Sequence, residues 1–156
     1  MDFVEIATCE IANILGRLLP SQSNDWWRNL VWNNLNDRQK NLVSMKTNPT
    51  LQDLDLASLL AVVDANWGRL GEMHRDNREA RNYLMELKTI RNQLCHRTSR
   101  PTPVELALRQ WQTLKLFLKS LGGSEAAIRL IDSQLCRLVK SYQSELSLGP
   151  QRMLAS

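Results

Sequence analysis

Arginine, asparagine and histidine stand close together in the segment 91–96, which has the sequence RNQLCH. Histidine changes protonation near neutral pH and can serve as a general base or a general acid. Arginine offers a planar set of donors that matches phosphate oxygens. Reactions at a phosphate need a base, an acid and positive charge on the phosphorane. Arg91, Asn92 and His96 are therefore candidate catalytic residues.

These three residues lie on a helix predicted over about 78–96. At about 100° per residue, its apolar arc contains Ala80, Tyr83, Leu84, Leu87, Ile90, Leu94 and Cys95. Arg91 falls inside this arc, whereas Asn92 and His96 fall on the polar side. An arginine on an apolar face needs an anion, and Asp64 of the preceding helix or a bound phosphate could supply it. Taken singly, Arg91 could form an ordinary salt bridge, and His96 could be a surface residue near a helix end.

The positive charge of the chain is concentrated around the same residues. The whole chain has a net charge of +4. The window 75–100 contains seven Lys and Arg residues and three Asp and Glu residues, so it accounts for the whole excess. Most such charge runs are solvated helix faces. The overlap of this run with the segment 91–96 nevertheless favours a polyanionic ligand.

The first half of the chain has helical periodicity, and no segment alternates as a strand does. Apolar spacing predicts helices over about 2–19 and 56–70. Between them, a tryptophan-rich segment over about 24–45 predicts one or two shorter helices, with Asn24 as an N-cap. The Thr-Asn-Pro-Thr sequence at 47–50 predicts a turn.

The second half has clear helix boundaries. Thr102 as N-cap, Pro103 at the first helical position and Glu105 at the third predict a capping box. The two glycines at 122–123 predict the end of that helix. Ser124 is then expected to cap the last helix.

These amphipathic helices with short connections predict an all-α fold, an antiparallel bundle of about five to six helices. We expect a single domain over 1–146 and a flexible C-terminal tail over 147–156. No apolar stretch is long enough to cross a membrane, and the N-terminus does not resemble a signal peptide. We therefore expect a cytoplasmic protein.

Other chemistries find less support. The three cysteines, Cys9, Cys95 and Cys136, are far apart, so neither a disulfide framework nor a zinc site is expected. Glu72, His74 and Asp76 could suggest a metal site, but their spacing is not helical and a fourth ligand is missing. No phosphate-binding loop, dinucleotide fingerprint or hydrolase motif occurs. No metal or other cofactor is expected.

The tryptophans at 26, 27 and 32 could stack on nucleobases. Tryptophans at these spacings are more often core or interface residues, because an indole buries a large apolar area. Packing is therefore the favoured role for these three side chains.

The pattern Arg91-Asn92-x-x-x-His96 resembles the R-x4-6-H motif of the HEPN superfamily. Two further stretches resemble one subgroup, the HEPN domain of a eukaryotic mRNA-surveillance endonuclease and of many bacterial proteins. They are LLAVVDANW at 59–67, and Tyr83-x-x-Glu86-Leu87 ahead of the motif. The helix over 111–121 with its two glycines also resembles that subgroup, so that the resemblance covers about 56–130. An aromatic often stands between the Asn and the His in the subgroup, whereas this chain has Gln-Leu-Cys.

The resemblance implies a HEPN-like four-helix core with extra N-terminal helices. It also implies a metal-independent endoribonuclease in which two chains form one composite site. His96 would be the base or acid, Arg91 would stabilise the phosphorane, and Asn92 would orient the site or bind phosphate. Lys88, Arg97 and Arg100 would hold the RNA backbone. The spacing agrees with a need for two chains, because Arg91 and His96 lie about 140° apart on a regular helix, unless the helix frays near Cys95.

The expected partners are RNA and a second copy of the chain, and a cognate inhibitor protein would fit the same interpretation. A toxin, a defence effector or an RNA-processing factor would fit such an enzyme by analogy. The alternative reading is a non-catalytic HEPN module of a larger protein that binds RNA or dimerises. A plain helical scaffold, with no RNA affinity at any salt concentration, is the third.

Overall fold

The computed structural model describes residues 2–71, 77–96 and 100–155. Its elements are α1 (Phe3–Leu18), the π-helical turn η1 (Trp27–Val31), the 3-10 turn η2 (Trp32–Asn34), α2 (Asp37–Ser44), the 3-10 turn η3 (Leu51–Asp53), α3 (Leu56–Ala65), α4 (Trp67–Gly71), α5 (Asn77–Cys95), α6 (Val104–Ser120) and α7 (Glu125–Ala155). The described residues contain no strand. The prediction of an all-α fold is confirmed.

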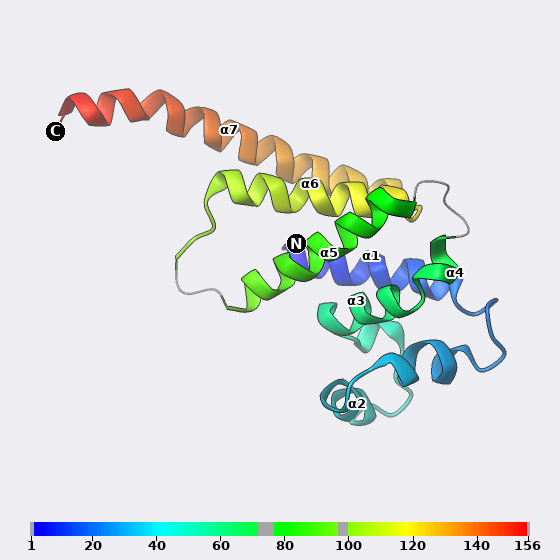
Figure 1. Ribbon diagram of the computed structural model, residues 1–156. Coiled ribbons are helices and arrows are strands. Elements are labelled where there is room, and N and C mark those ends of the chain that lie inside the picture. The colour runs from blue at the N-terminus through cyan, green and yellow to red at the C-terminus, as the bar shows by residue number, and fades with distance from the viewer. Residues whose placement is uncertain (1, 72–76, 97–99, 156) are drawn as a thin grey trace.

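The long helices form a bundle around α5 and α6 (Figure 1). Helices α6 and α7 run side by side in opposite directions, and α5 packs against α6 and α3. Helix α1 contacts α3, η3 and α6. The core consists of the apolar faces of these helices, and fully buried residues come from each of α1, α3, α5 and α6: Ile11, Leu15, Leu59, Leu84, Leu87, Leu114 and Phe117. The apolar face of α5 therefore packs against both α3 and α6, which fixes the orientation of the helix.

Local sequence explains where several helices begin. Asp2 and Glu5 form a capping box at the start of α1, and Asn36 and Gln39 form another at the start of α2. The Ser124 hydroxyl accepts a hydrogen bond from the Ala127 amide at 3.1 Å, so its expected role as the cap of the last helix is confirmed.

Two predicted caps are wrong. Asn24 does not cap the tryptophan-rich segment, because η1 begins after Trp26 without a side-chain cap. Helix α6 begins one residue later than expected, with Pro103 as its N-cap in an extended conformation (ψ 143°) and no side-chain cap. Glu105 then lies too early for a capping box, and its carboxylate instead accepts a hydrogen bond from the Tyr142 hydroxyl at 3.0 Å.

The helix predicted over 56–70 is interrupted. Asn66 leaves the helical conformation (φ −102°, ψ 14°) and separates α3 from α4. Its buried side-chain amide donates to the carbonyls of Leu30 and Val62, both at 2.8 Å. Since Leu30 belongs to η1, this contact joins the tryptophan-rich segment to the end of α3.

The end of the chain also differs from expectation. Helix α7 continues to Ala155, whereas the sequence pattern over 147–156 indicated no regular structure. In Figure 1, α7 extends past the start of α6. The flexibility of this tail and the domain boundary at 146 stay predictions.

Candidate functional site

The candidate catalytic residues lie in the last turn of α5 and just beyond it. The helix continues regularly to its end, because the His96 amide donates to the Asn92 carbonyl at 3.1 Å. The predicted alternative, fraying near Cys95, is therefore not seen. Five residues at about 100° each place Arg91 and His96 roughly 140° apart around the helix axis. The two side chains leave α5 on different sides.

The environments of the three residues differ. Arg91 is half-buried, whereas Asn92 and His96 are exposed. One guanidinium nitrogen of Arg91 lies 3.4 Å from the Asn92 side-chain oxygen, a long hydrogen bond. Within the described residues, Arg91 makes no ion pair. Its charge is thus available to an external anion.

Asp64 of α3 faces α5, but it does not pair with Arg91 as predicted. Its carboxylate forms ion pairs with Arg81, at 2.8 Å, and with Lys88. Arg81 and Lys88 are seven residues apart and so share one stripe of α5, whereas Arg91 is rotated about 60° from Lys88. A helical wheel places residues around one helix and does not show which of them the neighbouring helix faces.

The Asp64 cluster, defined as Asp64, Arg81 and Lys88, is electrostatically coupled. The hydrogen bond from Lys88, together with Arg81 and against the effect of burial, holds the pKa of the Asp64 carboxyl below its ordinary value. Arg81 also lies over the indole of Trp67, 5.9 Å from the ring centre. Lys88, a predicted RNA ligand, is thus already partly neutralised within its own chain.

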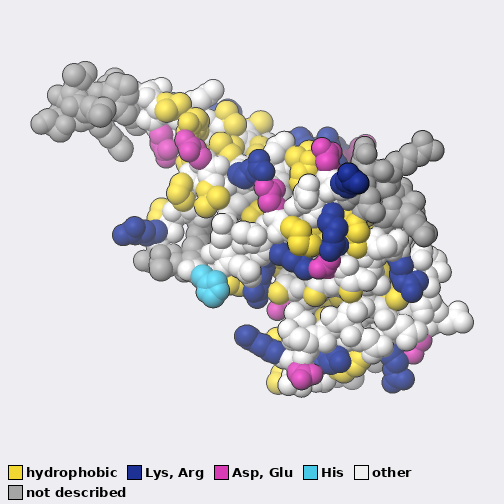
Figure 2. Space-filling view, viewed as in Figure 1, with side chains coloured by type: hydrophobic (Ala, Val, Ile, Leu, Met, Phe, Trp, Pro, Cys, Tyr) yellow, Lys and Arg dark blue, Asp and Glu magenta, His cyan; other side chains and the backbone are white. Residues whose placement is uncertain are grey.

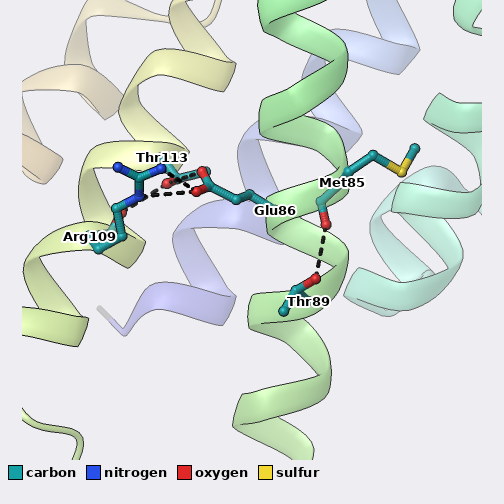
Figure 3. A network of polar contacts seen from close by, with 5 residues as sticks. All are labelled: Met85, Glu86, Thr89, Arg109 and Thr113. Atoms are coloured by element: carbon teal, nitrogen blue, oxygen red, sulfur yellow. Dashed lines mark hydrogen bonds and ion pairs between the residues drawn. The ribbon is translucent and has the colours of Figure 1, made fainter.

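A second polar network joins α5 to α6 (Figure 3). The Glu86 carboxylate accepts hydrogen bonds from the Arg109 guanidinium, at 3.0 and 2.5 Å, and from the Thr113 hydroxyl, at 2.7 Å. Burial raises the pKa of the Glu86 carboxyl, but these hydrogen bonds outweigh it and hold the pKa below its ordinary value. The network fixes the rotation of α5 against α6 five residues before Arg91.

Sequence reasoning missed this network. Glu86 belongs to the charged window 75–100 and to the family resemblance, but the sequence predicts no contact between it and Arg109 or Thr113. The available signal was Thr113, a polar residue with only 2% exposure in the apolar stripe of α6. A buried hydroxyl needs a hydrogen-bond partner, which would have directed attention to α5.

The remaining predicted residues are distributed as follows. Arg100 is exposed just before α6. Arg97 lies outside the described residues, as do Glu72, His74 and Asp76. Among the residues that the structure does describe, no three metal-binding side chains cluster. No helix in the described ranges is long and apolar enough to cross a membrane.

The structure places the motif Arg91-Asn92-x-x-x-His96 at the end of α5, a helix that packs against α3 and α6. Comparison with family models gives a match to the Swt1-like HEPN family over residues 9–122. The chain belongs to that family. The match includes the whole segment 91–96 and confirms the subgroup that the sequence resembles. Comparisons with curated proteins and with solved structures gave no match.

Proposed function

We propose that this HEPN protein is a metal-independent endoribonuclease. The observation that carries the proposal is the placement of Arg91, Asn92 and His96 in the last turn of a well-packed helix and just beyond it. The imidazole is exposed there, and the guanidinium is free of carboxylates in the described chain. His96 would take the proton from the 2′-hydroxyl or give one to the leaving 5′-oxygen. Arg91 would stabilise the charge on the phosphorane, and Asn92 would orient the guanidinium.

We further propose that two chains form one composite site. Because Arg91 and His96 leave a regular helix about 140° apart, one copy cannot easily direct both at the same phosphate. A two-fold axis beside the last turn of α5 would bring Arg91 of one copy near His96 of the other. The exposed stripe of α5 that includes Met85, Asn92 and His96 is the surface proposed for this contact.

Lys88, Arg100 and Arg97 are proposed to hold the RNA backbone, with Lys88 contributing least because of Asp64. A cytoplasmic location, a cognate inhibitor and a role in defence or RNA processing belong to the same proposal. The inhibitor and the role rest on analogy alone.

The test is cleavage of single-stranded RNA in EDTA by the parent protein and by Arg91→Ala and His96→Ala. Arg129→Ala is the matched control, since Arg129 is exposed at the start of α7, at the opposite end of the bundle from the motif. We expect the parent and the control to cleave, and both motif variants to lose at least roughly a hundredfold in rate. Equal inactivity of all four proteins would contradict the nuclease and favour the non-catalytic module.

A further inference from the structure

A groove lies beside the candidate catalytic residues, where α5 ends and α6 begins. Figure 1 shows these two helix ends. Two adjoining hollows form it, and they share Leu94, Pro101, Thr102 and Gln110 as lining residues. The larger one encloses about 500 Å³ and reaches the first residues of α1. This volume lies within the range typical of small-ligand sites.

Apolar side chains, two of them aromatic, line one part of the larger hollow. Phe3 and Trp111 meet edge to face with ring centres 5.1 Å apart, and both are at most 9% exposed. Leu94 completes the apolar lining from the α5 side. A flat apolar ligand could bury its face here, as unpaired nucleobases do on aromatic and aliphatic side chains.

Several polar residues line the groove, among them Asp2, Thr102, Gln134 and Arg100. The two that contact each other are the side-chain amides of Gln93 and Gln110. Gln110 is only 5% exposed, and its amide nitrogen donates to the Gln93 amide oxygen at 3.5 Å. This distance is at the upper limit for a hydrogen bond, so little is lost when the pair opens. Each amide offers both donors and an acceptor, the combination that proteins use on the edges of nucleobases.

The groove also has the right position for an RNA substrate. Gln93 and Leu94, which line the groove, lie between Asn92 and His96 in the chain. Exposed Arg100 lines the smaller hollow, where it could contact a phosphate of an RNA strand that extends out of the groove. Resting on the proposed function, we infer that this groove binds an unpaired nucleobase next to the cleaved phosphate and sets the base preference of cleavage. Gln110 and Gln93 are the residues that read the base edge.

The test compares kcat/KM for four short single-stranded RNAs that differ only in the base flanking the cleaved bond. We expect the parent to prefer one base, and Gln110→Ala and Gln93→Ala to reduce that preference by roughly tenfold, the loss of about one hydrogen bond. Gln112→Ala is the matched control, because Gln112 is an exposed glutamine two residues along α6 that does not line the groove. It should keep the preference of the parent.

Exposed Gln93 keeps the test informative if the buried Gln110 variant unfolds, which circular dichroism would reveal. If the parent cleaves with a base preference that neither Gln93→Ala nor folded Gln110→Ala changes, the base-binding role of the groove is overturned but the nuclease is not. A parent that cleaves all four RNAs equally would do the same. Failure of the parent to cleave any RNA would overturn the proposed nuclease together with the groove.

Discussion

Asp64 is the acidic residue that limits the positive charge of α5. It forms ion pairs with both Arg81 and Lys88, so the charges of these two α5 residues are partly neutralised within their own chain. Arg91, one turn further on, makes no ion pair in the described residues. Arg91 thus lies closer to the end of α5 than Arg81 and Lys88, the two cations that Asp64 neutralises.

The first prediction concerns Asp64→Asn. Removing this carboxylate should release Lys88 and Arg81 for phosphate and raise the affinity for single-stranded RNA by a few-fold at low salt. Fluorescence anisotropy with a labelled oligonucleotide on the inactive His96→Ala background measures this. Glu125→Gln, which removes a charge at the start of α7, is the control and should change affinity much less. An unchanged or weaker affinity in Asp64→Asn would mean that Asp64 positions Lys88 rather than masking it.

The second prediction concerns the acid stability of the Glu86 network. Because the pKa of Glu86 is held below its ordinary value of 4.5, its ionised form stabilises the fold above that pH, and the stabilisation is lost as the pH falls below it. Urea unfolding of the parent and Glu86→Gln should therefore differ most at about pH 6 and converge towards about pH 3. A constant difference across this range would show that the network acts through packing instead of charge.

At the scale of the elements, the sequence predicted the helices whose apolar faces repeat regularly. Helix α1 was placed to within one residue at each end, since Asp2 and Pro20 mark its limits and its periodicity is uninterrupted. The break at Asn66 was not predicted, because the apolar pattern continues across it and only the long-range contact with Leu30 explains it. The partners of Asp64 and the Glu86 network were not predicted for the same reason. Both depend on which faces of neighbouring helices pack together, and the sequence of one helix does not determine this.

The third prediction tests that contact. Asn66→Ala removes two hydrogen bonds from a side chain that is 3% exposed, and should lower the free energy of unfolding by about 1–2 kcal/mol. The loss stays moderate because Asn34 also donates to the Leu30 carbonyl, at 2.9 Å. Asn82→Ala on the exposed face of α5 should change the free energy by less than about 0.5 kcal/mol. Urea titration followed by tryptophan fluorescence gives both values, and equal effects would rule out the structural role of Asn66.

At the scale of the whole molecule, the bundle presents one end to the proposed substrate. The last turn of α5, the groove and Arg100 gather where α5 ends and α6 begins, and Figure 2 shows Lys and Arg side chains spread over the face that carries the exposed histidine. The family match over residues 9–122 shows that the chain follows the family pattern from α1 to the end of α6, and not only in the short motif.

The fourth prediction concerns the salt dependence of RNA binding. If Arg91, Arg100 and Lys88 each contact one phosphate, the logarithm of the affinity should fall against the logarithm of salt with a slope of roughly −2. Arg100→Ala should make the slope shallower by about 0.7, while the control Arg129→Ala should leave it unchanged. Anisotropy titrations at several salt concentrations measure the slope. A slope near zero would exclude backbone binding by these residues.

The divergence of Arg91 and His96 around α5 has a consequence for inheritance. If each catalytic centre draws its arginine and its histidine from different copies, a cell that makes intact and substituted chains together assembles mixed pairs. In a pair of one Arg91→Ala chain and one intact chain, the centre that needs the arginine of the substituted chain would be inactive. The other centre would keep both of its residues. Two defective alleles, one changed at Arg91 and the other at His96, would then complement each other, although neither acts alone.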